Sequence, residues 1–246
     1  MMRTPSRRPI SCLLAAAAAA TLQSGCTQMT STALNSEGVR LYQAGDYRGS
    51  LEKFDKAIAA DPKEATSYYN MAAALHKNGK LYNRPDDLQR AERLYNQCLD
   101  YDGDHADCYR GLAVLLTETN RQDAAFRLLE GWAGRSPQNP DARIELARLL
   151  EETRNYPQAT TKLVEALSID PQNARALTAL GRLREMAGDS AQALANYQRS
   201  LSVNRFQPEV AARVAALQAA GAGAPAIMAA PPATRTVERW NGAVRY

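Results

Sequence analysis

Residues 31–64 have the sequence STALNSEGVRLYQAGDYRGSLEKFDKAIAADPKE, and this pattern returns four more times along the chain. Apolar residues recur every three or four positions from residue 34 to residue 44 and again from 48 to 60. This spacing gives each stretch one apolar face and predicts two amphipathic helices. A Gly-Asp-Tyr turn at 45–47 separates them, and Pro62 ends the second helix because proline cannot continue it.

Three alignment columns repeat with the same intervals of 41, 34, 34 and 34 residues. A position late in the second helix gives Ala57, Cys98, Trp132, Ala166 and Ser200; an apolar position three residues earlier gives Phe54, Tyr95, Leu129, Leu163 and Tyr197; the repeats end at Pro62, Gly103, Pro137, Pro171 and Arg205. Because so short a helix pair cannot bury its own apolar face, we expect the repeats to stack.

Two further columns bring the pattern close to a known family. The first helix carries a small residue at Gly38, Ala72, Ala113, Ala147 and Gly181, and an Ala or Ser opens the second helix at Ser50, Ala91, Ala125, Ala159 and Ala193. With the 34-residue period, these columns resemble the tetratricopeptide repeat (TPR) family over residues 31–207. Arg184 replaces a leucine of the other repeats and Arg205 replaces proline, so we expect the last repeat to be looser.

The resemblance implies an all-α fold, a right-handed solenoid of about five helix-turn-helix repeats with a C-terminal capping helix. The expected segments are a signal peptide at 1–25, a short linker at 26–30, repeats at 31–64, 65–105, 106–139, 140–173 and 174–207, a cap helix at 208–220, and a flexible Gly/Ala/Pro-rich tail at 221–246.

The second repeat is seven residues too long, and the excess lies between Gly79 and Ala91. Insertions in such arrays usually map to the turn between the two helices, so we expect this one to protrude at one edge. It is either a tolerated loop, an extra helical turn or an accessory binding element around Tyr82.

The N-terminus has the features of an export signal. A basic stretch precedes an apolar run from Ile10 to Leu22, which is too short to span a bilayer and normal for a signal peptide. Ser24, Gly25 and Cys26 then resemble the end of a bacterial lipoprotein signal, although Gln23 departs from it. We therefore predict lipid attachment at Cys26 and a membrane-anchored protein facing the periplasm. Ordinary cleavage, releasing a soluble periplasmic protein, is the alternative.

Charge and residue types exclude several functions. Loss of three signal-peptide arginines lowers the formal charge from +4 to +1, and a near-neutral exported chain argues against nucleic acid. The two histidines, His76 and His105, belong to no metal-spaced cluster, and the glycine-rich residues 221–223 lack the Lys and Ser/Thr of a phosphate loop. We therefore predict no catalytic site, no metal, no cofactor and no small-molecule substrate.

Two cysteines remain once Cys12 leaves with the signal and Cys26 carries lipid. Cys98 ends one repeat and Cys108 begins the next, so the two side chains could approach in an oxidising compartment. The alternatives are a disulfide and two small buried thiols at a packing seam.

The family resemblance implies a protein-protein interaction scaffold with a concave groove lined by the first helices. The predicted partner-binding positions are Asn35, Val39, Tyr42, Tyr69, Asn70, His76, Arg110, Val114, Ile144, Arg148, Arg175 and Arg182. Tyrosines at one end and arginines at the other favour a peptide with an apolar part and an acidic part. We expect Tyr69→Ala or Arg148→Ala to weaken binding without unfolding the array. Alternatively, the groove is merely solvated or is filled by the chain's own tail around Trp240.

The leading functional prediction is a scaffold of the cell envelope that holds a protein or peptide partner and helps to assemble an envelope, secretion or pilus complex. A soluble periplasmic adaptor for an enzyme supplied in trans is a second possibility. A helical-repeat RNA-binding protein is a third, which export and neutral charge disfavour.

Overall fold

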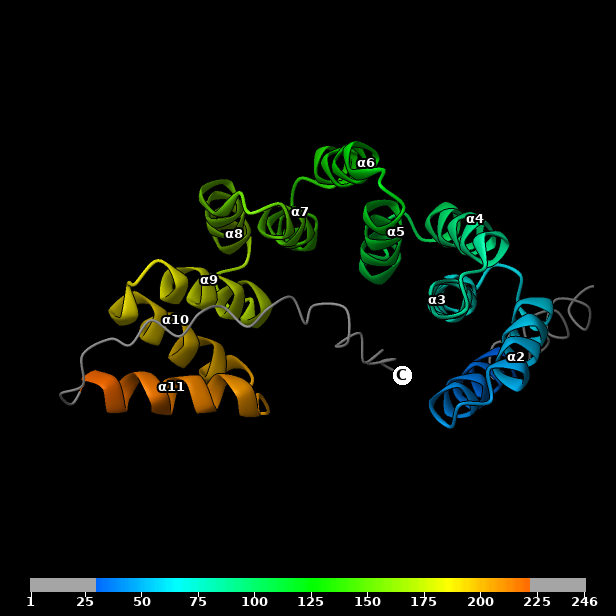
Figure 1. Cartoon of the computed structure of the whole chain (residues 1–246), viewed down its shortest axis with the longest axis horizontal. Helices are drawn as coiled ribbons and strands as arrows, with labels where there is room; N and C mark the ends of the chain where they lie inside the picture. The colour runs from blue at the N-terminus through cyan, green and yellow to red at the C-terminus, as the bar shows by residue number, and fades with distance from the viewer. Residues whose placement is uncertain (1–29, 222–246) are drawn as a thin grey trace, which may run out of the picture. The chain divides into compact units, whose positions relative to one another are not determined.

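The computed structural model describes residues 30–221 (Figure 1). Cys26, the predicted signal peptide and the predicted tail after residue 221 lie outside the described residues. Residues 30–221 contain helices joined by short turns and no strand, which confirms the predicted all-α class. No helix in this part of the chain combines the length and the apolar character that a membrane crossing requires.

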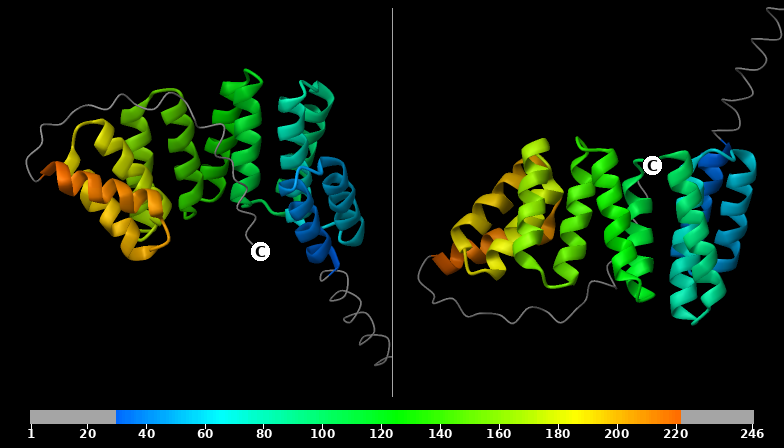
Figure 2. Two further views of the ribbon diagram at one scale, coloured as in Figure 1. Left: turned by 60° about the horizontal axis from the view of Figure 1, so that its bottom comes forward. Right: turned by 90° about the horizontal axis from the view of Figure 1, so that it is seen from above.

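Consecutive helices run alongside one another within each repeat, as Figure 2 shows. After a helix at residues 30–43, the elements are α2 (Tyr47–Ala60), α3 (Ala65–Leu81), α4 (Pro85–Tyr101), α5 (Ala106–Glu118), α6 (Gln122–Arg135), α7 (Pro140–Glu152), α8 (Tyr156–Ile169), α9 (Ala174–Met186), α10 (Ser190–Val203) and α11 (Pro208–Gly221). The odd-numbered helices up to α9 are first helices of repeats, and α11 follows the last repeat.

The seven extra residues of the second repeat lengthen both of its helices. Helix α3 has 17 residues where α5, α7 and α9 have 13, and α4 has 17 where α6, α8 and α10 have 14. The insertion therefore adds about one turn to each helix. The expectation of a protruding loop is wrong, because the connection between Leu81 and Pro85 stays as short as the other turns.

A left-handed residue stands in the turn after the first helix of each repeat. Gly45 and Gly188 have φ of 84° and 83°, while Asn83, Asn120 and Arg154 have φ of 51°, 60° and 61°. Glycine adopts this conformation without cost and asparagine adopts it more readily than most residues, but arginine carries the full steric penalty of its Cβ. The turn thus forms because the two helices on either side of it pack together.

Capping side chains mark where first helices begin. Glu64 accepts a hydrogen bond from the Ser67 amide, and Asn173 accepts one from the Ala176 amide. At the same position in the third repeat, His105 Nδ1 accepts from the Cys108 amide at 3.3 Å. These contacts satisfy amides that have no partner within the helix.

The small-residue column of the first helices has a steric cause. A Cβ added to Gly38 would lie 2.5 Å from the Phe54 ring, and one added to Gly181 would lie 2.7 Å from the Tyr197 ring. The third and fourth repeats pair alanine with leucine at these two columns instead of glycine with an aromatic residue. Facing positions therefore complement each other in volume in four repeats, while the second repeat pairs Ala72 with Tyr95.

The described chain divides into two compact units, residues 30–108 and residues 109–221, here called the N-terminal and C-terminal units. In the C-terminal unit, one apolar cluster joins α7, α8 and α9 through residues such as Leu150, Leu163 and Leu180, and a smaller cluster joins α10 to the cap helix α11 through Tyr197 and Val210.

Candidate functional site

Arginines from three consecutive first helices of the C-terminal unit converge on one carboxylate, Glu145 of α7. Glu145 Oε1 accepts hydrogen bonds from Arg110 Nε and Nη2 at 2.9 and 2.7 Å, and from Arg175 Nη2 at 2.5 Å. Glu145 Oε2 accepts from Arg148 Nε at 2.9 Å. The 34-residue repeat places these side chains on one face of α5, α7 and α9, so three residues that are far apart in sequence share one partner.

The Glu145 side chain is fully buried, with 0% exposure. Burial alone would raise its pKa, but the charges of Arg110, Arg148 and Arg175, with the hydrogen bond from Arg110, lower the pKa to about 2. The carboxylate is therefore ionised at neutral pH, and its charge holds the guanidinium groups in place.

Further acids surround this centre. Asp141 accepts a hydrogen bond from Arg175 Nη1 at 2.9 Å, and Glu152 pairs with Arg148 Nη1. Asp141, Glu145 and Glu152 therefore balance the charges of Arg110, Arg148 and Arg175. We call these six residues the arginine face. The arginine face therefore carries three positive and three negative charges. The sequence-based prediction of an acidic ligand had assumed an excess of positive charge.

One donor of this face has no partner. Arg148 Nη2 is buried and forms no hydrogen bond within the described residues. Beyond the face, Arg182 pairs with Glu151 through Nη2 at 2.6 Å. All four arginines that the sequence predicted as partner-binding thus already have acidic partners in the C-terminal unit, and each still exposes a quarter to a half of its side chain.

The predicted groove residues of the N-terminal unit lie elsewhere. Asn35, Val39, Tyr69, Asn70 and His76 expose only 4–9% of their surface. Their side chains belong to the packed interior of that unit, so the prediction that they line an open groove is wrong in this respect. The periodicity located the correct helix positions, but neighbouring side chains cover them.

Tyr69 illustrates how these positions are covered. Its ring lies 5.5 Å from the His105 ring and 6.4 Å from the Tyr95 ring, measured between centroids. Asn35 is held in a different way, because its amide nitrogen donates to Glu64 Oε2 at 2.9 Å and to Ser67 Oγ at 2.8 Å. These contacts join neighbouring helices, which is a structural role.

Three predicted positions remain. Tyr42 is partly exposed, its ring lies 5.2 Å from the Lys77 ammonium, and burial raises the pKa of its hydroxyl. Val114 is partly exposed on α5. Ile144 is 6% exposed and packs in the apolar cluster of α7, α8 and α9.

The structure joins Cys98 and Cys108 by a disulfide between α4 and α5, with Cα atoms 6.5 Å apart. It also brings His105 next to them, since the donor atoms of these three residues lie within 4.8 Å of one another. The sequence spacing of the three residues did not indicate this grouping. The disulfide occupies both sulfurs and His105 Nδ1 caps α5, which explains the cluster without a metal.

Sequence reasoning missed Glu145 and Asp141. Arg148 follows Glu145 by three positions and Glu152 follows Arg148 by four, a spacing that predicts ion pairs along one helix. Nothing in that spacing indicates that Arg110 and Arg175, 35 and 30 positions away, share the same carboxylate.

Comparisons with known proteins agree with this architecture. Family models described as TPR repeat match residues 38–79, and models described as Tetratricopeptide repeat match residues 86–140 and 163–195. The chain therefore contains tetratricopeptide repeats. Tetratricopeptide repeat protein 36 of Mus musculus is 42% identical over 64 residues, which are 26% of this chain and 34% of that protein. The similarity thus spans only about a third of the curated relative.

Solved structures show the same fold. TTC0263, a thermophilic TPR protein of Thermus thermophilus, aligns with a TM-score of 0.57 and 19% identity over 77% of this chain and 99% of that one. PilF of Pseudomonas aeruginosa aligns with a TM-score of 0.53 and 15% identity over 80% and 86%. PilW, a widely conserved type IV pilus biogenesis factor, aligns with a TM-score of 0.53 and 18% identity over 79% and 88%.

Proposed function

We propose that this protein is a non-catalytic scaffold of the bacterial cell envelope that holds a protein or peptide partner against the arginine face. The observation that carries the proposal is the convergence of Arg110, Arg148 and Arg175 on the buried Glu145. Stacked helix pairs present such side chains on one continuous surface, which suits an extended partner.

The arrangement suits binding because the guanidinium groups are already fixed. A partner that meets a preorganised arginine loses less side-chain entropy than one that must order it. Asp141 and Glu152, each about one third exposed, would be replaced by carboxylates of the partner, while the buried Glu145 would stay. The partner would therefore carry acidic groups, and its binding would weaken as salt rises.

The cellular place of this scaffold rests on the sequence before residue 30. A basic stretch, an apolar run and Ser24-Gly25-Cys26 support export and lipid attachment at Cys26. A lipid anchor would hold the repeats at the membrane surface, where envelope complexes assemble. PilF and PilW share the fold at low identity, and a role in pilus or secretion assembly is accordingly part of this proposal.

Crosslinked purification of the full chain from membranes tests the proposal. Wild type should capture a partner that Arg148→Ala and Arg175→Ala lose, each weakening binding by about 1–3 kcal/mol. Lys56→Ala, which removes an exposed cation of the N-terminal unit, is the control and should retain the partner. Equal capture by all variants would contradict the arginine face as the site. Cys26→Ala should move the protein to the soluble fraction, and membrane retention would contradict the anchor.

A further inference from the structure

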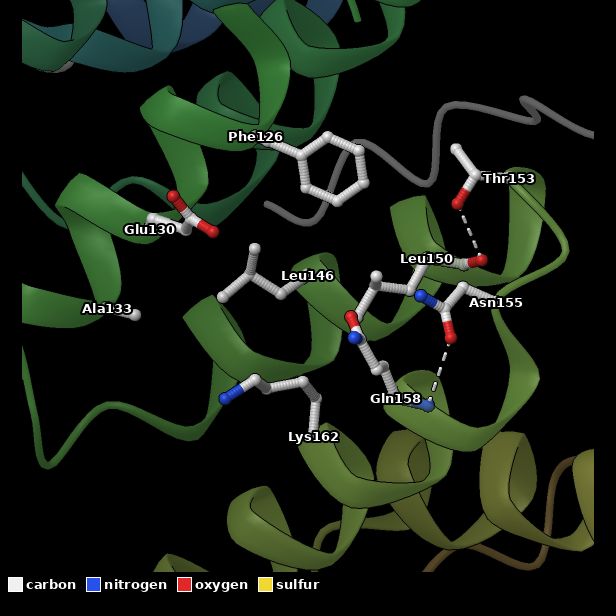
Figure 3. Close-up of a pocket in the computed structure, with 9 residues that line it drawn as sticks. All are labelled: Phe126, Glu130, Ala133, Leu146, Leu150, Thr153, Asn155, Gln158 and Lys162. Carbon is white, nitrogen blue, oxygen red and sulfur yellow. Dashed lines mark hydrogen bonds between the residues drawn. The ribbon is translucent and has the colours of Figure 1, made fainter. Parts of the chain in front are cut away.

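A cleft of about 610 Å³ opens in the C-terminal unit between α6, α7 and α8. Figure 3 shows Phe126 of α6 and Leu146 and Leu150 of α7 pointing toward its centre. Glu130 of α6 and Lys162 of α8 lie at its edge. The volume is within the range of ordinary ligand pockets.

The cleft has a cause in the repeat. Ala133 occupies a column in which the other four repeats carry large aliphatic residues, Ile58, Leu99, Leu167 and Leu201. In the next repeat, Leu167 packs against the apolar cluster of α7, α8 and α9, and Leu201 packs against the cluster that includes Val210 of α11. A leucine-sized side chain is therefore missing at Ala133, beside Leu146 and Leu150, which expose 5% and 7% of their surface.

The large side chain of this part of α6 lies one position before Ala133, at Trp132. Trp132 occupies the small-residue column, is fully buried, and stacks on Tyr109 with ring centroids 4.1 Å apart. Because successive residues of a helix point in directions about 100° apart, Trp132 fills the contact with α5 and leaves the α7 side open.

The cleft is separate from the arginine face. On α7, Leu146 and Leu150 form one stripe at a spacing of four, while Glu145, Arg148 and Glu152 form another at spacings of three and four. No residue of the arginine face lines the cleft. A ligand in one would leave the other uncovered.

The charged side chains at the edge of the cleft indicate which charge a ligand of the cleft would carry. Lys162 already donates two hydrogen bonds to Glu165, at 2.9 and 3.0 Å. Glu130 is exposed, and among the described residues it has no ion-pair partner. The edge therefore offers one uncompensated carboxylate next to an apolar hollow.

We propose that this cleft is a second docking site, which takes a leucine or isoleucine side chain of a partner protein segment that also carries an adjacent lysine or arginine. The aliphatic group fills the space that Ala133 leaves against Leu146 and Leu150, and the cation pairs with Glu130. The acidic partner of the arginine face and this basic, aliphatic segment differ in charge, so the two sites select different sequences.

The test uses a synthetic peptide of alternating lysine and leucine, titrated into the full chain while methyl NMR signals of Leu146 and Leu150 are followed. Binding should shift these signals. Ala133→Leu, which fills the cleft, should weaken binding at least about tenfold, and Glu130→Lys should weaken it several-fold. Ala133→Ser keeps the space, and Asp100→Lys makes the same charge change in the N-terminal unit, so both should bind as wild type does.

Further arms separate this site from the arginine face. A peptide with serine in place of leucine should not bind, and Arg148→Ala should bind the lysine-leucine peptide normally. Unchanged binding by Ala133→Leu, or binding that leaves the Leu146 and Leu150 signals in place, would overturn the proposal. Thermal unfolding of each variant verifies that it is folded, and Glu130→Lys tests the site even if Ala133→Leu perturbs the packing.

Discussion

The two compact units differ at one position of the first helices, which is covered at Tyr69 of the N-terminal unit and partly exposed at Arg110 of the C-terminal unit. In the N-terminal unit, Tyr69 packs against His105 and Tyr95 and exposes 8% of its surface. In the C-terminal unit, the equivalent position on α5 is Arg110, which reaches Glu145 and remains a quarter exposed. The repeat thus fixes the position of a side chain on its helix, while the chemistry of that side chain decides whether neighbouring residues cover it.

The physical difference is the cost of burial. Burial of an aromatic ring against neighbouring rings stabilises the folded protein, so the aromatic residues of the N-terminal unit cover one another. A guanidinium can be covered only when carboxylates compensate its charge, so Arg110, Arg148 and Arg175 remain partly exposed around the buried Glu145.

The largest effect is expected from Tyr69→Ala. Removing a buried ring that contacts His105 and Tyr95 should cost about 3–5 kcal/mol in the free energy of unfolding, because the cavity collapses only in part. Urea unfolding followed by circular dichroism measures it. Arg110→Ala at the equivalent position should cost less, because Arg148 and Arg175 continue to pair with Glu145. Equal losses of unfolding free energy in the two variants would contradict the description of Tyr69 as covered and Arg110 as partly exposed.

Glu145→Gln should cost about 3 kcal/mol, because it leaves three arginines without their shared buried charge. Chemical denaturation of the variant measures the loss. Glu151→Gln, next to the exposed Arg182, is the matched control and should change the free energy of unfolding by less than about 1 kcal/mol. A neutral Glu145→Gln variant would show that Glu145 does not organise the arginine face.

The pH dependence follows from the same carboxylate. Its pKa is about 2 in the folded protein against 4.5 for the free group, so between these values the unfolded chain binds more protons than the folded one. Stability from Glu145 is therefore complete above about pH 4.5 and is lost as the pH falls toward 2. The acid limb of unfolding free energy against pH should be shallower in Glu145→Gln than in wild type, and identical slopes would contradict this assignment.

Replacing both Cys98 and Cys108 with serine should cost about 2–3 kcal/mol, the loop entropy of a bridge between residues ten positions apart. A reductant breaks the bridge of the wild-type chain and should destabilise it. The double variant has no such bridge, and the C-terminal unit contains no cysteine, so the reductant should leave the stability of the variant unchanged. Labelling the unfolded, unreduced chain tests the bridge directly: two reactive thiols at these positions would show that it is absent.

The smallest effect is expected at the turns. Arg154→Gly should stabilise the protein by about 1 kcal/mol, because glycine removes the Cβ strain of a φ of 61°. Gly188→Ala at the equivalent turn should destabilise by a similar amount, since its φ is 83° and nothing else crowds the position. Thermal unfolding of both variants checks the opposite signs.

The tetratricopeptide repeats and the all-α class were predictable from sequence, because the period of 34 residues survives in several columns at once. The positions of the arginines on the first helices were predictable for the same reason. The placement of the seven-residue insertion within α3 and α4 was not, since residues 82–90 contain helix-compatible and turn-compatible residues alike.

The repeat, the helix pairs and the caps depend on side chains that are close together along the chain, so the sequence is sufficient to specify them. Tertiary packing is responsible for the covering of Tyr69, for the sharing of Glu145 by Arg110 and Arg175, and for the cleft beside Ala133. Each of these depends on atoms that come from different helices. Local periodicity fixes the direction of a side chain, and the packing of neighbouring helices fixes what it meets.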